Sequence, residues 1–144
     1  MTINIRPAVD EDRYNIATIR NSGREFMTHN TNHITAEEQD QWWFSPNRQN
    51  AHIWIVETDY MPIGFCMIRT MYDSGRNYGT LAILPEYRGQ GIGTLLYQFM
   101  IAACNELWID VRNDNIASMN AALKAGFEVY YIGVSVTELV YRKD

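Results

Sequence analysis

The stretch Arg88-Gly-Gln-Gly-Ile-Gly93 constrains the fold of this chain more than any other, because three glycines stand at alternate positions between two apolar segments. The segment before it, Tyr78 to Leu84, is typical of a buried strand. The segment after it repeats apolar residues at helical spacing, from Ile92 to Ala103, over about four turns. Glycines in such a connection indicate that the backbone approaches another group closely or adopts positive φ.

The rest of the chain supplies further strands and helices around this unit. The patterns predict strands at 2–5, 51–57, 63–71 and 107–111 and two more after Phe127, and helices from Asp10 towards Phe26, after the capping box Thr35 to Glu38, and over 115–125. This order predicts an α/β (α+β) fold of one domain, 1–144, with a mixed, mostly antiparallel sheet. A strand–helix–strand unit near residues 81–111 adds one parallel pair, with helices on both faces.

Composition narrows the class of protein. The net charge of −5 argues against an extended nucleic-acid surface, and no segment approaches the roughly 18 apolar residues of a membrane span. The N-terminal residues lack the pattern of a signal peptide, and two cysteines, Cys66 and Cys104, fit a reducing cytoplasm. The spacing of His29 and His33, with few acids or thiols nearby, does not suggest a metal site.

The glycine loop is suited to a phosphate, because a helix N-terminus offers unpaired amide donors and the positive end of a dipole. Two specific phosphate motifs fail here. The Walker pattern needs a lysine between Gly93 and Thr94, and the dinucleotide fingerprint needs a glycine at Leu96. A tight turn without any ligand is the alternative for the loop taken alone.

The loop resembles the acyl-CoA-binding motif of the GNAT superfamily of N-acyltransferases, which reads Arg or Gln, two residues, Gly, one residue, then Gly or Ala. A second motif of that superfamily is matched downstream by Val111-Arg-Asn-Asp-Asn115-Ile-Ala-Ser118 and Lys124-Ala-Gly126-Phe127. The resemblance covers residues 78–127 well, and the N-terminal elements suit the family fold more loosely.

The resemblance implies acetyl-CoA as co-substrate and no metal. Amides of the loop would cradle the pyrophosphate, a bulged strand before the loop would bind the pantetheine arm, and an asparagine would hold that arm from the other side. The implied cofactor-binding residues are Ala82, Ile83, Leu84, Arg88, Gly89, Gln90, Gly91, Ile92, Gly93, Thr94, Asn115 and Ser118.

The implied reaction is direct attack of a primary amine on the acetyl thioester, with a main-chain amide near Ile83 polarising the carbonyl. Members of the family often protonate the leaving thiolate with a tyrosine seven residues after the asparagine, where this chain has Ala122. Ser118 is a substitute donor, or a hydroxyl that satisfies helix-terminal backbone groups. Tyr97, Tyr130 and Tyr131 are spare phenols or packing residues, and of these Tyr130 is our catalytic candidate.

The acceptor is expected at the other mouth of the slot, near Glu25, His29, Tyr78 and Thr80, with Asp110 or Glu57 as proton acceptors through water. The resemblance implies a small-molecule or peptide amine as partner. We expect no nucleic acid and no membrane, on the charge and hydropathy given above, and a monomer or homodimer. Two rival functions remain: a catalytically silent acyl-CoA sensor, which the missing tyrosine favours, and a nucleotide-binding protein, which the failed motifs disfavour.

Overall fold

The computed structural model describes residues 2–143 and contains one seven-stranded sheet. The strands are β1 (Asn4–Pro7), β2 (Ala51–Thr58), β3 (Met61–Thr70), β4 (Asn77–Ile83), β5 (Glu106–Arg112), β6 (Glu128–Ile132) and β7 (Val136–Arg142). They lie in the order β1-β2-β3-β4-β5-β7-β6, and all neighbours are antiparallel except β4 and β5, which are parallel. The predicted mixed sheet with one parallel pair is confirmed.

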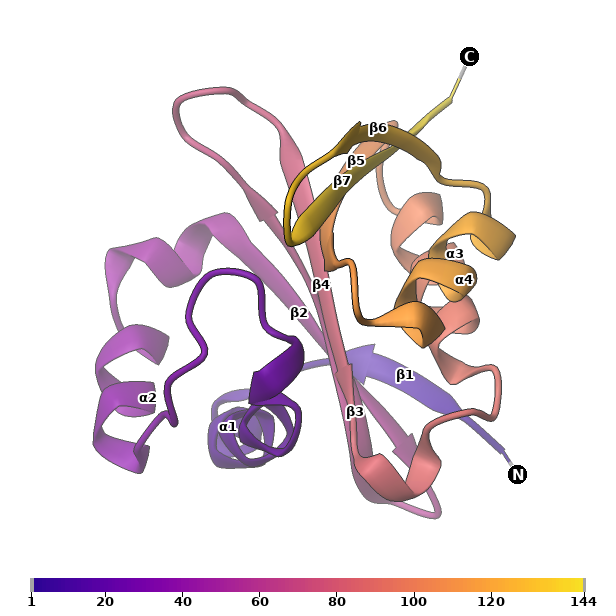
Figure 1. Cartoon of the computed structure of the whole chain (residues 1–144). Coiled ribbons are helices and arrows are strands. Elements are labelled where there is room, and N and C mark those ends of the chain that lie inside the picture. Colours follow the sequence, from indigo (N-terminus) through magenta and orange to yellow (C-terminus); the bar gives the residue numbers. More distant parts are fainter. Residues whose placement is uncertain (1, 144) are drawn as a thin grey trace.

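Four α-helices cover the two faces of this sheet. The helices α1 (Arg13–Ser22) and α2 (Ala36–Trp43) lie on one face, and α3 (Ile92–Ala102) and α4 (Ile116–Ala125) lie on the other (Figure 1). The expected capping box at Thr35 and Glu38 begins α2, and Gly126, at φ 112°, ends α4. The first helix ends at Ser22 and is followed by a 3₁₀ turn over Arg24–Phe26, so it is shorter than predicted. The helix after the glycine loop has 11 residues, which is three turns rather than four.

Short 3₁₀ helices complete the connections at Asp10–Asp12, Pro46–Asn50 and Pro85–Tyr87. Two hydrophobic cores fill the space between the sheet and its helices. The core under α3 and α4 includes Leu96, Met100 and Leu107, all fully buried. The core under α1 and α2 includes Ile19, Ile55 and Phe65. Within residues 2–143, no helix combines the length and the apolar character that crossing a membrane requires.

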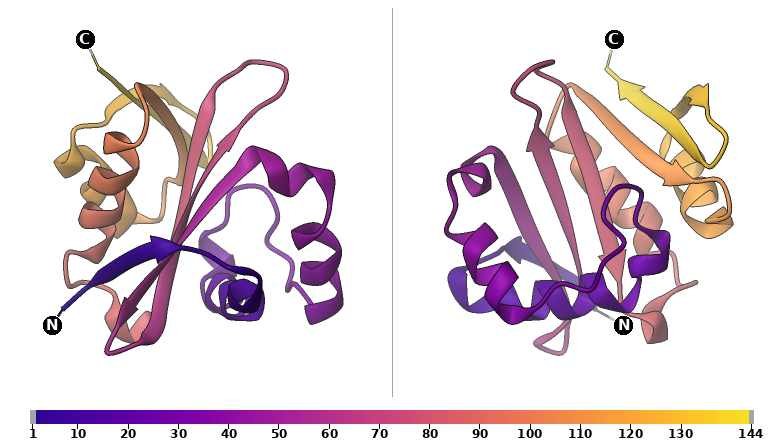
Figure 2. Two further views of the ribbon diagram at one scale, coloured as in Figure 1. Left: turned by 180° about the vertical axis from the view of Figure 1, so that it is seen from behind. Right: turned by 60° about the vertical axis from the view of Figure 1, so that its left-hand side comes forward.

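The sheet divides between β4 and β5. These strands share one backbone pair, Tyr78 with Trp108 near their N-terminal ends, and then diverge, as Figure 2 shows. Beyond that pair β5 follows β7 along its whole length while β4 follows β3. The expectation of a bulge in the strand before the loop is wrong, because β4 keeps an unbroken register with β3 from Asn77 to Ile83.

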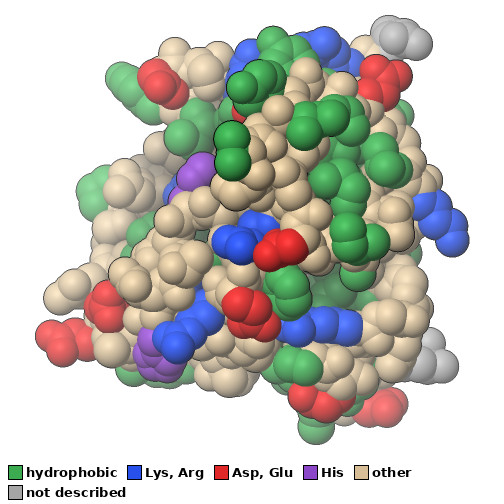
Figure 3. Space-filling model, viewed as in Figure 1, with side chains coloured by type: hydrophobic (Ala, Val, Ile, Leu, Met, Phe, Trp, Pro, Cys, Tyr) green, Lys and Arg blue, Asp and Glu red, His purple; other side chains and the backbone are tan. Residues whose placement is uncertain are grey.

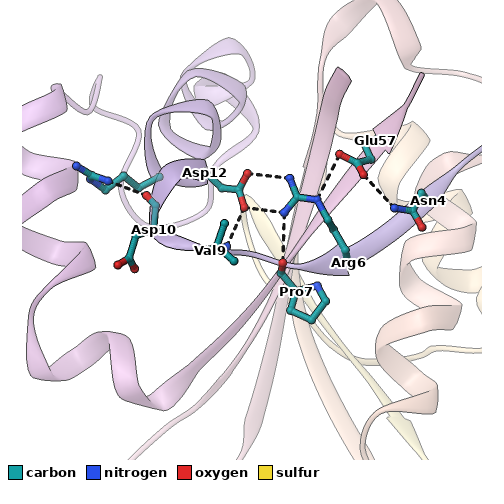
Figure 4. Close-up of polar contacts among 8 residues, drawn as sticks. Asn4, Arg6, Pro7, Val9, Asp10, Asp12 and Glu57 are labelled. Carbon is teal, nitrogen blue, oxygen red and sulfur yellow. Dashed lines mark hydrogen bonds and ion pairs between the residues drawn. The ribbon is translucent and has the colours of Figure 1, made fainter. Parts of the chain in front are cut away.

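A polar network fastens the N-terminal strand to the start of α1 and to β2. Arg6 donates two hydrogen bonds to the carboxylate of Asp12, at 2.8 and 2.9 Å, and a third to Glu57 at 3.3 Å (Figure 4). Asp12 also accepts from the backbone N–H of Val9 at 2.8 Å. These bonds hold the pKa of Asp12 below its ordinary value, chiefly through Arg6. Glu57, considered above as a proton acceptor, belongs to this structural network instead.

Candidate functional site

The divergence of β4 and β5 opens a cavity of about 470 Å³. Its walls come from β4, β5, the glycine loop, the N-terminal turns of α3 and α4, and the segment after α1. The lining residues that the sequence predicted are Thr80, Ala82, Ile83, Arg88, Gly89, Gly91, Gly93, Thr94, Asn115 and Ser118. Residues nearly forty positions apart in the chain therefore surround one space, as the two motifs together led us to expect.

The backbone of β4 presents unpaired amides to this cavity. The N–H of Leu84 bonds to the carbonyl of Ile63 at 2.8 Å, which fixes the alternation of hydrogen bonds along β4. In an antiparallel pair only alternate residues bond across to the neighbour. The amides of Ala82 and Thr80 therefore face β3, whereas those of Leu81 and Ile83 face the side from which β5 has departed. Two amide donors are thus aimed into the cavity.

The glycine loop closes one end of the cavity. Gly89 has φ 76° and Gly91, the N-cap of α3, has φ 82°. Both conformations favour glycine, and a Cβ added at either position would meet nothing within 4 Å. The backbone of the loop and the first amides of α3 are consequently open to an approaching group, which suits an anion.

Two basic side chains also line the cavity. Arg88 donates from Nε to the carbonyl of Ile83 at 3.0 Å, and its guanidinium lies over the ring of Phe26. Lys124 belongs to α4, and we did not predict it as a site residue from the sequence. It lies on the same face of the helix as Ala117 and Ala121. Helical spacing from Asn115 onwards was the signal that could have found it.

The start of α4 supplies the polar groups of the opposite wall. The side-chain oxygen of Asn115 accepts from the N–H of Ser118 at 3.3 Å and caps the helix, which leaves the amide nitrogen of Asn115 for another partner. The hydroxyl of Ser118 lies 2.7 Å from the hydroxyl of Tyr97, which comes from α3. Tyr97 is 4% exposed, and burial raises the pKa of its phenol although the bond to Ser118 opposes the shift.

Ala122, at the position where a tyrosine was expected by resemblance, is fully buried in the core under α3 and α4 and does not line the cavity. The phenol that reaches the cavity comes instead from the neighbouring helix, at Tyr97.

A second cavity of about 430 Å³ adjoins the first, on the face of the sheet that carries α1 and α2. Both are lined by Thr28, Gly79, Thr80 and Asp110, which mark the junction between them. At this junction Oδ2 of Asp110 lies 3.1 Å from Nε2 of His29. His29 and Tyr78, expected at the acceptor side, line this second cavity, and Thr80 lines both.

Other predicted residues lie outside both cavities. Leu84 uses its N–H in the pairing with β3, Ile92 is buried in the core, and Gln90 is exposed, with its side chain directed to the carbonyl of Glu86. Glu25 is exposed in the turn after α1.

Tyr130 also lies away from the site, since its ring packs edge-on against Trp108 with centroids 4.8 Å apart. Its side chain is exposed, as are other apolar side chains of β6, and green apolar surface gathers over this part of the molecule in Figure 3. No group of three or more metal-ligating side chains occurs in the described part of the chain.

A mixed sheet opened between two parallel strands, with a glycine cradle at the N-terminus of the following helix, defines the class to which this protein belongs. The family model described as the Acetyltransferase (GNAT) family matches residues 16–127. The chain is a member of this family.

One curated relative is the peptidyl-lysine N-acetyltransferase YjaB of Salmonella typhimurium, 31% identical over 80 residues, which are 55% of this chain and 52% of the relative. The chain spans about half the length of the curated relatives it matches.

Solved structures share the whole fold at low identity. The ribosomal-protein-alanine N-acetyltransferase of Brucella melitensis superimposes with a TM-score of 0.82 at 19% identity, covering 97% of this chain and 99% of that one. The spermidine N-acetyltransferase of Vibrio cholerae, in complex with CoA and spermine, gives a TM-score of 0.77 at 16% identity and covers 96% and 94% of the two chains.

Proposed function

We propose that this protein transfers an acetyl group from acetyl-CoA to a primary amine of a small molecule or peptide, by direct attack with both substrates bound. One observation carries the proposal: the opening between β4 and β5 presents the amides of Leu81 and Ile83, and the N-terminus of α3 stands at its end. Supporting it are the membership of the family and the acetyltransferase activities in the names of its relatives.

The residues present fit coenzyme A. The open backbone at Gly89 and Gly91, with the first amides of α3, suits a pyrophosphate, and Lys124 adds a positive charge. Along the slot, the free amide of Leu81 and the side-chain nitrogen of Asn115 suit the amide groups of a pantetheine arm. Ala82 contributes a small side chain rather than its N–H, which is used by β3.

The amide of Ile83 is our oxyanion donor. In the transfer a C–N bond forms, the C–S bond of the thioester breaks, and the electron pair of the broken bond goes to sulfur. Negative charge builds on the carbonyl oxygen before that bond breaks. A fixed donor aimed at this oxygen stabilises the transition state.

The acceptor amine must lose a proton before attack, because an alkyl ammonium has a pKa of about 10.4. Asp110 at the junction of the two cavities is positioned to take it, directly or through water, and His29 is its hydrogen-bond partner. The departing thiolate takes a proton from the hydroxyl of Ser118. Tyr97 then gives its own proton to Ser118 through the hydrogen bond between the two hydroxyls.

Turnover tests the proposal. Purified protein is incubated with acetyl-CoA and a panel of primary amines, while thiol release is followed and products are identified by mass. We expect thiol release that depends on an added amine, with one acetyl group gained by that amine.

The buried Ala122, where the family often has a tyrosine, favours one rival: a catalytically silent acyl-CoA sensor. That rival predicts tight binding of acetyl-CoA by titration calorimetry with no amine that accelerates thiol release.

A further inference from the structure

The wall of the second cavity is rich in charged side chains. It carries three basic side chains, His29, Arg69 and Arg76, and three acidic ones, Asp73, Asp110 and Glu138. A molecule seated there reaches the first cavity across the shared junction at Thr80 and Asp110. The charges in the second cavity therefore bear on which amine can arrive at the slot.

Most of these charges are already matched within the protein. Arg76 lies 3.7 Å from the carboxylate of Glu138, and its guanidinium stacks over Trp108 with the carbon 3.8 Å from the ring centroid. His29 and Asp110 pair at 3.1 Å. Asp73 lies exposed in the turn between β3 and β4, at the rim, where water solvates it.

Arg69 is the one basic residue of this set without a partner. Among residues 2–143 its guanidinium makes no hydrogen bond or ion pair, and unlike the exposed Asp73 the residue is half-buried in the cavity wall. A guanidinium presents five donors in a planar fork that suits a carboxylate or a phosphate. A partly desolvated guanidinium without a protein partner can bind an anionic ligand through charge-assisted hydrogen bonds.

The position of Arg69 on β3 gives its distance from the junction of the two cavities. Arg69 is paired with Tyr78, and Met67, two residues earlier on β3, is paired with Thr80 at the junction. Two residues of strand span about 7 Å. Side chains at alternate positions share one face, so Arg69 and Asp110 lie on the face that carries α1 and α2.

We propose that the acceptor of this protein is a primary amine that also carries an anionic group, carboxylate or phosphate. Arg69 binds the anion, and the amine lies at the junction beside Asp110. This inference rests on the proposed acetyl transfer for its chemistry, but the recognition itself is a property of the second cavity. Arg69 lies about 7 Å of strand from the position of Met67 beside the junction, and its side chain covers part of that distance. The amine and the anion of such an acceptor are therefore about 7 Å apart or less.

Binding to the protein saturated with coenzyme A tests the inference. The probes are 4-aminobutanoate, 3-aminopropyl phosphate and their uncharged counterpart butylamine, titrated by calorimetry. We expect at least one anionic amine to bind about tenfold or more tightly than butylamine. The affinities of 4-aminobutanoate and 3-aminopropyl phosphate show whether the cavity prefers a carboxylate or a phosphate.

Variants locate the effect. Arg69→Gln should abolish the preference for the anionic amine, and Arg69→Lys should keep part of it. The matched control is Arg142→Gln, which removes an arginine of β7 that pairs with Glu106 outside both cavities and should keep the preference in full. Equal binding of butylamine and both anionic probes, or a preference that survives Arg69→Gln, overturns the inference.

A parallel assay with acetyl-CoA separates this inference from the proposed function. Selective binding through Arg69 without acetyl transfer to the bound amine supports the inference and contradicts the enzyme. Transfer to butylamine and to the anionic amines at equal kcat/KM supports the enzyme and overturns the inference.

Discussion

The hydroxyl oxygens of Tyr97 and Ser118 lie 2.7 Å apart, so that α3 and α4 meet through one hydrogen bond at the wall of the first cavity. Burial raises the pKa of the Tyr97 phenol, so this group keeps its proton throughout the neutral range. A protonated phenol behind a serine hydroxyl can replace a proton that the serine gives to a thiolate. In the proposed reaction the pair would supply the proton that members of the family often take from a tyrosine at the position of Ala122.

The first prediction concerns this pair. Ser118→Ala should lower kcat by roughly tenfold to a thousandfold, because proton transfer to a leaving group contributes about 10² to 10⁴. Tyr97→Phe should lower it in the same direction, and the double variant should lose less than the product of the two, since both act through one bond. The measurement is steady-state transfer to any accepted amine. Parent-like turnover by Ser118→Ala would make Ser118 a capping residue and return the proton donor to water.

The second prediction tests the glycine cradle. Gly91→Ala should weaken coenzyme A binding about tenfold or more, because a methyl group at φ 82° enters the open space before α3. The matched control is Gly75→Ala, at φ 70° and with equally open surroundings, in the turn between β3 and β4. Both should cost about 1 kcal/mol of stability. Equal coenzyme A affinity in the two folded variants would place the pyrophosphate elsewhere.

The third prediction separates two roles of Asn115. Asn115→Asp keeps an oxygen that caps α4 but loses the amide donor, whereas Asn115→Ala loses both. The aspartate variant should keep the parent Tm and raise the KM for acetyl-CoA with little change for the amine. The alanine variant should in addition lose about 1 kcal/mol of stability. An effect confined to the KM of the amine would move Asn115 to the acceptor side.

The fourth prediction concerns the network of Figure 4. Asp12→Asn should destabilise the protein by about 2 kcal/mol at pH 7, because Arg6 loses its charged partner. The folded pKa of Asp12 is depressed, so its contribution is present above the unfolded pKa of about 3.9 and is lost as the pH falls through the folded value. Denaturant unfolding of parent and variant should therefore converge below pH 4. A constant difference down to pH 2 would show that packing, not charge, holds Asp12.

Local signals in the sequence were sufficient for much of the fold. The alternation of residues in β2 and β3, the capping box before α2 and the glycine after α4 each concern neighbours along the chain, and each was found where expected. The same holds for the strand, loop and helix around Arg88 to Gly93. The glycines there predicted positive φ, which Gly89 and Gly91 adopt. The end of α1 at Ser22 was missed because Gly23 gave the only signal and the apolar pattern continued to Phe26.

The sequence alone thus determined the elements, their order and the loop, because helical and strand periods depend on neighbours a few residues apart. Only the tertiary structure decided which side chains meet across elements. Tyr97 reaches Ser118 over 21 positions and His29 reaches Asp110 over 81, while Tyr130 turns to Trp108 and Ala122 enters the core. These outcomes follow from how each helix is rotated against the sheet and from where β5 leaves β4. Both are set by the packing of the whole core, which no local pattern encodes.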